Sequence, residues 1–331
     1  MTLQTIGNPP SVKGHYEYHS VIGALAGSGP GFSGPVSLDF GPDGNLYVAS
    51  RGNPNQHEAV RVTRCTKDGE YLGQMPGWGE GEGEFIWITD IAFNAEGKLF
   101  ATEEHTHRIN VYDPTDFSFL YTFGEHGSGE GQLDRPSGIA FDSCNNVLVV
   151  DSLNNRVQQY SVDGKFLGQW GEFGDGEGQF NMPWDIFIDG DDNVFVTDWR
   201  NDRVQKLTRD GQVLMVFGGS GDGEGQFNRP TGIATDADGD IYVCDWMNDR
   251  VQVFDAQAKY KDTLIGHGGV SKWAQDYLDA NPEIEHKLKL AEQNIEPKRR
   301  FYRPVSVKVD TDNKVYVADC YRHRVQIYQK V

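Results

Sequence analysis

Short apolar runs separated by turn residues recur along most of the chain. Between Gly138 and Trp170, four such runs are divided by segments rich in Asn, Asp and Gly. The first two runs are almost continuously apolar, which is typical of strands buried between neighbouring sheets. The pattern predicts four short strands in this segment, at residues 138–142, 147–151, 156–161 and 165–170.

This four-strand unit is repeated six times, with copies that start near residues 35, 88, 136, 183, 230 and 304. One arginine begins the third predicted strand of every copy: Arg61, Arg108, Arg156, Arg203, Arg250 and Arg324. Successive arginines are 47, 48, 47, 47 and 74 residues apart. The longer last gap places one insertion between the fifth and sixth copies.

Six copies of four strands predict an all-β fold, a six-bladed β-propeller that forms a single domain over residues 1–331. The sixth copy ends at Val331 after only three strands. The segment at residues 16–23 fits the missing fourth strand. A ring closed in this way has no free sheet edge, so we expect the N-terminal strand to complete the last blade.

The insertion at residues 267–302 has helical periodicity. A first helix is predicted from Ser271 to Leu278, with Trp273 and Tyr277 on one side, and a second from Glu283 to Asn294. The basic patch Lys298-Arg299-Arg300 follows. We expect a helical hairpin over the channel mouth, acting as a lid or a docking element. The alternative is that the insertion is a loop without a function.

The motif Asp-x-x-Asn-x-Arg-Val occurs at residues 151–157, 198–204 and 245–251 and resembles the NHL repeat. The resemblance extends over residues 16–328. It implies the fold strongly and the function weakly, since propellers of this kind include lyases, sensors and scaffolds. Because the Asp and Arg recur from blade to blade, we interpret them as a structural latch.

Charge restricts the possible partners. Thirty basic and forty-nine acidic residues give a net charge of −19, which disfavours binding to nucleic acid or to an anionic membrane. No run approaches eighteen apolar residues, and Met1 to Ser11 lacks the pattern of a signal peptide. We therefore expect a cytoplasmic protein whose partner is a small molecule or another protein.

Candidate ligand-binding residues gather on one predicted face. The links from second to third strands and the links between blades share that face, and four of the seven tryptophans fall there. Tryptophans and arginines together suggest apolar walls with a few directed charges. Inter-blade packing, with Arg stacked on Trp and paired to a carboxylate, is the alternative. The candidates are Trp87, Trp184, Asp185, Trp199, Arg200, Trp246 and Arg303.

Histidines mark the blades that depart from the repeat. His57, His105 and His323, or His107 in place of the last, lie on neighbouring links and could bind a divalent metal such as Zn²⁺. Solvated loop histidines are the alternative. The acidic loops between blades lack the flanking helices of an EF-hand, so we interpret them as connectors rather than calcium sites.

The chain is also distantly similar to peptidyl-amidoglycolate lyase, another NHL-like propeller. Ser50-Arg51-Gly52-Asn53 resembles the Arg-Gly-Asp-type link whose arginine contacts substrate in that family, which implies Arg51 as an anion anchor. That family takes its zinc from histidines directly after the blade-opening proline, and no blade of this chain has one there. Similarity to calcium-dependent lactonase propellers would instead implicate Glu104, Asp90 and Asp185.

Two functions are therefore open. The first is a propeller that binds a small molecule or a protein at the channel mouth. The alternative is a lyase- or hydrolase-like enzyme, in which Arg51 anchors an anionic group and His105, His57 or Tyr321 serves as acid or base, with Zn²⁺ or Ca²⁺ as a possible cofactor. A flat, filled channel mouth would favour the first.

Overall fold

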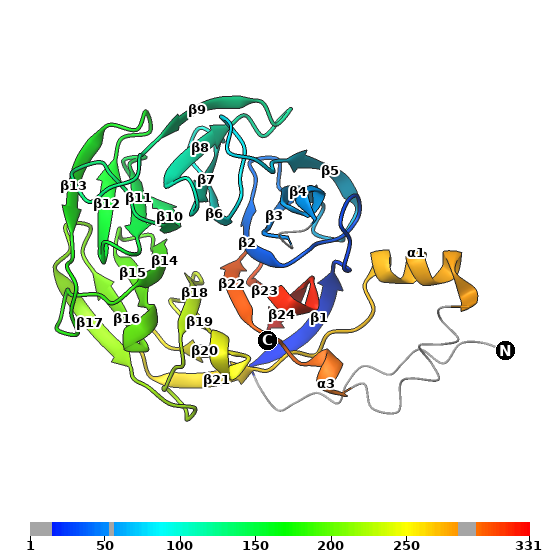
Figure 1. Cartoon of the computed structure of the whole chain (residues 1–331). Helices are drawn as coiled ribbons and strands as arrows, with labels where there is room; N and C mark the ends of the chain where they lie inside the picture. The colour runs from blue at the N-terminus through cyan, green and yellow to red at the C-terminus, as the bar shows by residue number, and fades with distance from the viewer. Residues whose placement is uncertain (1–14, 53–55, 284–295) are drawn as a thin grey trace.

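The computed structural model describes residues 15–52, 56–283 and 296–331. Six four-stranded antiparallel sheets are arranged as blades around a central channel (Figure 1). The first strand of each blade lies nearest the channel, and the fourth lies on the outside. The prediction of an all-β six-bladed propeller is confirmed.

The strands of the blades, in sheet order, are as follows. Blade 1 has β2 (Pro35–Phe40), β3 (Leu46–Ser50), β4 (Arg61–Cys65) and β5 (Tyr71–Pro76), and blade 2 has β6 (Ile88–Phe93), β7 (Leu99–Glu103), β8 (Arg108–Tyr112) and β9 (Phe119–Phe123). Blade 3 has β10 (Pro136–Phe141), β11 (Val147–Asp151), β12 (Arg156–Tyr160) and β13 (Phe166–Trp170), and blade 4 has β14 (Pro183–Ile188), β15 (Val194–Asp198), β16 (Arg203–Leu207) and β17 (Val213–Gly218). Blade 5 has β18 (Pro230–Thr235), β19 (Ile241–Asp245), β20 (Arg250–Phe254) and β21 (Tyr260–Leu264), and blade 6 has β22 (Pro304–Val309), β23 (Lys314–Asp319), β24 (Arg324–Lys330) and β1 (Tyr16–Ile22).

Short helical turns follow several second strands, and the described part of the insertion contains two α-helices. They are η1 (His57–Ala59), η2 (Trp199–Asn201), η3 (Trp246–Asn248), η4 (Cys320–Arg322), α1 (Lys272–Ala280) and α3 (Glu296–Arg299). No helix in the described ranges has the length and apolar character needed to cross a membrane.

The hydrophobic core lies between the blades. Phe100 and Ile109 of blade 2, for example, pack with Val147 and Val149 of blade 3. Every residue of β3, β7, β11, β15 and β19 is buried, because these second strands are covered by a neighbouring sheet on each side. This explains the continuous apolar runs in the sequence.

The N-terminal strand closes the ring as predicted. β1 pairs antiparallel with β24, from Tyr16 opposite Lys330 to Ile22 opposite Val325. The last blade is therefore built from both ends of the described chain, whereas each of the other five sheets consists of four consecutive strands.

The repeated Asp and Arg form a latch, as interpreted from the sequence. In blade 3, Nε of Arg156 donates to Asp151 at 2.8 Å, and its other nitrogens donate to backbone carbonyls of the preceding inter-blade link. The same pair recurs in blades 4, 5 and 6 at 2.7–2.8 Å. The latch joins each link to its blade and so fixes the loops on one face.

The first helix of the insertion, α1, lies at the outer edge of the ring and does not cover the channel as a lid would (Figure 1). Trp273 of α1 packs edge-on against Phe32 and Tyr71, with ring centroids 5.4 and 6.5 Å apart. Lys272 pairs with Glu70 of the outer part of blade 1. Trp273 is the buried anchor of α1, and its partners lie where blades 6 and 1 meet, so the helix projects sideways from the ring (Figure 1).

Only part of the predicted hairpin can be compared with the structure. Tyr277, expected beside Trp273, is 58% exposed. The second helix was predicted for residues 283–294, and all but the first of these lie outside the described residues. The short helix α3 then takes the place of an inter-blade turn, because Arg324 donates to the backbone carbonyls of Lys298, Arg299 and Arg300.

Candidate binding face

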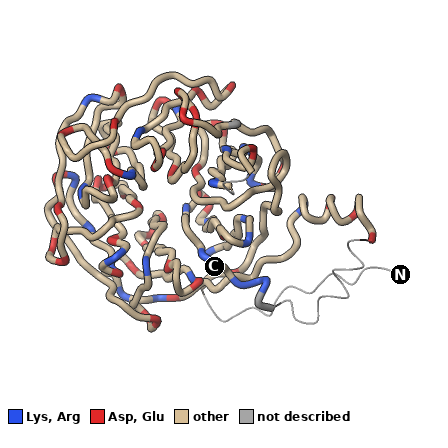
Figure 2. The backbone as a smooth tube through the Cα atoms, in the orientation of Figure 1, with Lys and Arg blue, Asp and Glu red and all other residues tan. Residues whose placement is uncertain are grey.

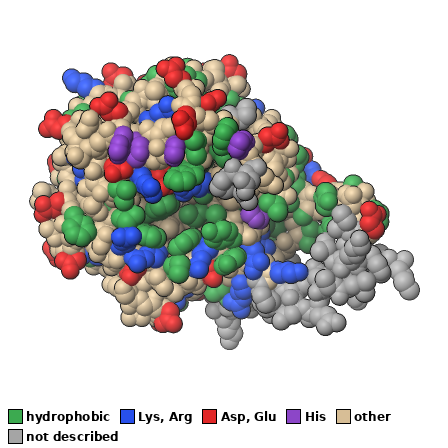
Figure 3. Space-filling view, viewed as in Figure 1, with side chains coloured by type: hydrophobic (Ala, Val, Ile, Leu, Met, Phe, Trp, Pro, Cys, Tyr) green, Lys and Arg blue, Asp and Glu red, His purple; other side chains and the backbone are tan. Residues whose placement is uncertain are grey.

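The links between second and third strands and the links between blades lie on one face of the ring, which we call the mouth face. The space-filling view shows hydrophobic side chains at the centre of this face, with Lys and Arg around them and histidines gathered on one side (Figure 3). This arrangement agrees with the face predicted from the alternation of strands and links.

Three tryptophans form a continuous apolar surface on the mouth face. The ring of Trp199 lies 6.4 Å from the ring of Trp184 and 6.4 Å from that of Trp246, measured between centroids. Arg229 lies over Trp199 at 4.7 Å, and Arg303 lies over Trp246 at 4.9 Å. Each guanidinium thus lies within cation–π distance of an aromatic ring.

Local backbone geometry places these arginines. Arg229 and Arg303 each precede a blade-opening proline and have positive φ angles of 59° and 62°. Their backbone N–H groups donate at 2.8 Å to Asp202 and Asp249 of the preceding blade. Because the backbone is pinned to the preceding blade, the side chain leans over that blade's tryptophan.

A second cluster surrounds Trp87. Arg51 and Arg135 lie over its ring at 5.2 and 5.9 Å, and both guanidiniums donate to Glu104, at 2.6 and 3.4 Å. His105 meets the same ring edge-on at 5.4 Å. Here a carboxylate neutralises the arginines, as the packing alternative predicts.

The tryptophan surface differs from the Trp87 cluster in its charge. Within the described ranges, neither Arg200 nor Arg229 has a carboxylate oxygen within 4 Å, and the nearest to Arg303 is Asp249 at 3.8 Å. Acidic residues are spread around the whole ring (Figure 2). The mouth face therefore carries a local positive charge on a chain whose net charge is −19.

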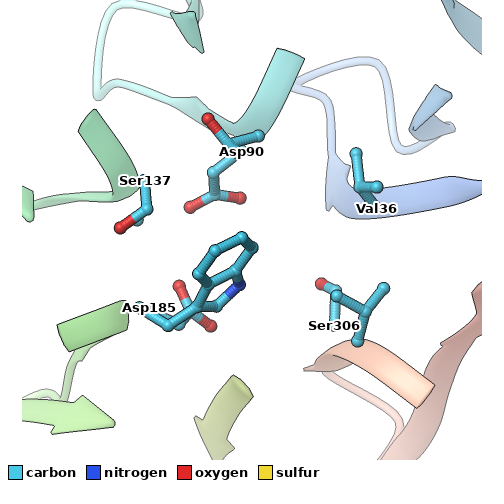
Figure 4. A pocket seen from close by; sticks show the side chains of 9 residues that line it. Val36, Asp90, Ser137, Asp185 and Ser306 are labelled. Carbon is cyan, nitrogen blue, oxygen red and sulfur yellow. The ribbon is translucent and has the colours of Figure 1, made fainter. Parts of the chain in front are cut away.

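The channel beneath the mouth is nearly filled. Its cavity has a volume of about 10 Å³, enough for about one water molecule. Asp90 of β6 and Asp185 of β14 point into it (Figure 4). Asp90 accepts the backbone N–H of Ile139 at 2.9 Å, and Asp185 accepts that of Ile233 at 3.0 Å. Each carboxylate thus accepts a backbone hydrogen bond from the next blade.

Burial in the channel changes the ionisation of these groups. Desolvation, followed by the charge of Asp90, raises the pKa of Asp185 to about 7. Desolvation also raises the pKa of Asp90. Desolvation lowers the pKa of Lys308, but the charges of Asp39, Asp90 and Asp185 outweigh it and raise that pKa. The channel is a coupled charge cluster within the fold.

Two of the three candidate catalytic residues, Arg51 and His105, contact the ring of Trp87, whereas Tyr321 contacts a different ring. Arg51 is paired with Glu104. His105 lies against Trp87, with Nε2 3.5 Å from Glu80. Tyr321 packs on Tyr302 and is 54% exposed. Among the described residues, no hydrogen bond or ring contact joins these three.

The predicted metal ligands are also dispersed. His57 stacks on Trp78, with ring centroids 3.4 Å apart, while His323 accepts the backbone N–H of Gly34 at 3.0 Å. The calcium candidates divide in the same way, because Glu104 pairs with arginines of the mouth whereas Asp90 and Asp185 face the channel. The predicted ligand-binding residues Trp184, Trp199, Arg200, Trp246 and Arg303 are brought together.

Two features of the face were not predicted from the sequence. Arg229 and Arg135 complete the stacked pairs, and their position directly before a blade-opening proline, like that of Arg303, was the available signal. His107, His126 and Asp134 place donor atoms within 4.8 Å of one another. His126 and Asp134 lie in the link between blades 2 and 3, where no ligand motif marks them.

Comparison with known proteins identifies the repeat. The NHL repeat model matches residues 133–160, 227–254 and 301–328. The chain is 51% identical over 45 residues to Protein lin-41 of Caenorhabditis elegans, a match that covers 14% of this chain and 4% of that protein. It is 31% identical over 127 residues to the E3 ubiquitin-protein ligase TRIM71 of Rattus norvegicus, covering 38% of this chain and 13% of the relative. The matches thus span only a small part of these relatives.

A solved structure resembles the whole ring. The catalytically inactive virginiamycin B lyase from Staphylococcus aureus with quinupristin superposes with a TM-score of 0.57 at 12% identity, covering 95% of this chain and 88% of that chain. At this identity the likeness concerns the fold alone. The repeat matches show that the chain contains NHL repeats, and the closed ring of six sheets shows that it has a six-bladed β-propeller fold.

Proposed function

We propose that the chain is a protein-binding propeller whose mouth face binds an acidic segment of a partner. The observation that carries this proposal is the tryptophan surface with stacked arginines that are incompletely neutralised. Trp, Tyr and Arg are the residues that contribute most to binding energy at protein interfaces. The mouth face is rich in these types, since Tyr302 and Tyr321 pack beside the tryptophan surface.

The stacked arginines are suited to carboxylates. Arg229 and Arg303 are held in one orientation by the aromatic ring beneath and by the pinned backbone. A guanidinium stacked on a ring keeps its N–H edge available for a bidentate contact with a carboxylate. Because little side-chain freedom remains to be lost, binding to an Asp or Glu side chain is favoured.

The shape of the channel supports a macromolecular partner. Pockets for small molecules usually enclose roughly 300–1,000 Å³. The channel cavity has a volume of about 10 Å³, so a ligand on this axis would lie across the surface rather than enter the ring. An extended peptide can contact both the tryptophans and the arginines in that position. The E3 ubiquitin-protein ligase among the matched relatives is an example of such repeats in a protein that acts on proteins.

The enzyme alternative has less support. Its anion anchor, Arg51, is already paired with Glu104 at 2.6 Å. Its acid or base candidates do not contact Arg51 among the described residues, and the likeness to a lyase structure concerns only the fold.

A peptide-display selection tests the proposal. A library would be selected on the wild-type chain and on the double variant Arg229→Ala, Arg303→Ala. We expect the wild type to enrich peptides with Asp or Glu beside apolar residues, and the double variant to bind them about tenfold or more weakly, since charged hydrogen bonds contribute about 1.5–3 kcal/mol each.

The control removes equal charge from the opposite face. Lys165 and Lys259 are exposed and lie at turns between third and fourth strands. The double variant Lys165→Ala, Lys259→Ala should bind the selected peptides as the wild type does. Enrichment of neutral or basic peptides, or equal binding by both double variants, would contradict the proposal.

A further inference from the structure

We propose that His107, His126 and Asp134 form a binding site for a transition-metal dication such as Zn²⁺, at the junction of blades 2 and 3. One donor atom from each residue lies within 4.8 Å of the others. Donors around a tetrahedral zinc ion are roughly 3.3 Å apart, given Zn–N bonds of about 2.0 Å. Small side-chain rotations would therefore bring all three donors onto one ion.

The three side chains already converge. Nδ1 of His107 lies 3.4 Å from Oδ1 of Asp134, and Nε2 of His126 lies 3.8 Å from the same oxygen. The two imidazole rings have centroids 4.2 Å apart and are tilted by 33° relative to one another. Two imidazoles and one carboxylate are a zinc-type donor set, whereas calcium takes six to eight oxygens.

Comparison with the other blades shows that the repeat does not require these residues. At the position of His126, blade 4 has Phe173 and blade 5 has Ser220 before the same parallel bridge. At the position of Asp134, the corresponding links carry Asn181 and Asn228, whose backbone N–H groups make the same hydrogen bond to the latch aspartate.

His107 does have a structural role. Its Nδ1 accepts the backbone N–H of Arg135 at 3.0 Å, and Asn155 and Asp202 accept the equivalent N–H groups in the next blades. Coordination through Nε2 would keep that hydrogen bond, and coordination through Nδ1 would replace it. Within the repeat, only this junction combines two histidines and an aspartate at the three positions.

The site is accessible and would remain open. The side chain of His126 is 66% exposed, while those of His107 and Asp134 are largely covered, so an ion would sit at the surface with two ligands held in place. Three protein donors leave a fourth tetrahedral position for water or another ligand. The next residue, Arg135, belongs to the Trp87 cluster, which places the site at the edge of the mouth face. The inference does not depend on the proposed peptide binding.

Metal titration on the full chain, without a histidine tag, tests this proposal. Zn²⁺ binding would be followed by calorimetry, and Co²⁺ binding by its visible absorption, which is intense for tetrahedral sites with nitrogen ligands. We expect one ion per chain. The variants His126→Phe and Asp134→Asn, which introduce the residues of blade 4, should each weaken Zn²⁺ binding roughly tenfold or more.

The outcomes are distinct from those of the peptide experiment. His57→Ala removes an exposed histidine that stacks on Trp78 and should bind Zn²⁺ with wild-type affinity. Zinc binding that persists unchanged in both His126→Phe and Asp134→Asn would overturn the assignment. A wild-type chain without Zn²⁺ heat and without a Co²⁺ spectrum would also overturn it, whatever the selected peptides do.

Discussion

The propeller has a regular half, blades 3, 4 and 5, and an irregular half, blades 6, 1 and 2. In the regular half every second strand ends in an aspartate that pairs with the arginine of the third strand, at 2.7–2.8 Å. In blade 1 that aspartate is replaced by Ser50, and in blade 2 by Glu103.

Blade 6 keeps the pair between Asp319 and Arg324, but the arginines of blades 1 and 2 are satisfied differently. Arg61 is fully buried and donates to the carbonyls of Ala26, Glu58 and Gly31 and to Thr63, without a carboxylate. In blade 2, Glu103 accepts backbone N–H groups instead, and among the described residues it makes no ion pair with Arg108. Backbone carbonyls of the links are therefore the constant part of the latch, and the carboxylate is the replaceable part.

The two halves also differ in chemistry. All nine histidines of the chain lie outside residues 127–266, while the contiguous tryptophans of the mouth face lie within that range. In blades 1 and 2, where the latch aspartate is replaced, the links between second and third strands contain histidines.

The largest expected effect comes from breaking the latch in the regular half. Asp198→Ala removes a fully buried carboxylate that accepts from Arg203, Asn201 and the backbone of Asn181. We expect a loss of about 3–5 kcal/mol in the free energy of unfolding, because the arginine is left without its counter-charge. Urea denaturation of the variant and the wild type measures it. A loss below 1 kcal/mol would be no larger than the contribution of a single hydrogen bond. It would show that the ion pair does not make the regular half more dependent on its latch.

The channel offers a second test, since its blades differ at one position. Blades 2 and 4 carry Asp90 and Asp185 where blades 3 and 5 carry Gly138 and Gly232. The pKa of Asp185 rises from 3.8 to about 7 on folding, so its contribution to stability is present below pH 3.8 and is lost as the pH rises to about 7.

Asp185→Asn removes that titration. The substitution can also change the free energy of unfolding by an amount that does not depend on pH. On top of that, the variant should gain stability relative to the wild type as the pH is raised across this window. Denaturation at a series of pH values measures the difference. Parallel curves for the two proteins would show that the folded carboxyl titrates normally.

A smaller effect is expected at the junction of blades 6 and 1. Nδ1 of His323 accepts the N–H of Gly34, and burial lowers the pKa of this histidine from 6.5. The unfolded chain therefore takes up the proton first, and stability is lost as the pH falls below 6.5. His323→Asn, which places the residue of blade 3 here, should reduce this loss, because asparagine does not titrate in this range.

Thermal unfolding near neutral pH and in mild acid compares the two proteins. Asn155 makes the equivalent hydrogen bond to Met182 at 2.8 Å, so the variant retains an acceptor. Equal acid sensitivity of variant and wild type would assign the pH dependence to other groups.

The smallest effect is expected at the position of the latch in blade 1. Ser50 is buried, and its hydroxyl accepts the backbone N–H of Ser33 at 3.3 Å. Ser50→Ala should cost about 1 kcal/mol or less, well below Asp198→Ala. The same urea experiment checks it. A cost equal to that of Asp198→Ala would show that blade 1 depends on this position as strongly as blade 4 does.

Features that depend on the spacing of residues along the chain could be predicted from the sequence. The phase of the repeated arginines determined the number of blades, and the missing strand after Tyr328 indicated the closure with Tyr16–Ile22. Alternation of strands and links placed Trp184, Trp199 and Trp246 on one face, because that inference needs only local order.

Contacts between residues far apart in the chain could not be predicted in this way. Trp273 packs on Phe32 and Tyr71, more than 200 residues earlier in the chain, and this contact helps to hold α1 at the outer edge of the ring. Arg51 meets Glu104 across a blade boundary, so its pairing was not visible from its own motif. His126 comes near His107 only through the turn of the link between blades 2 and 3.

The pairing of β1 with β24 has a consequence for the order of folding. Tyr16 meets Lys330 across nearly the full length of the described chain, so this contact has a high loop-closure entropy, while the other strand pairs are local. Blades can assemble one after another along the chain, but the sixth lacks its outer strand until the two ends meet. We therefore expect the ring to pass through an open, C-shaped intermediate, in which the bare edge of β24 is the surface most exposed to strand exchange between molecules.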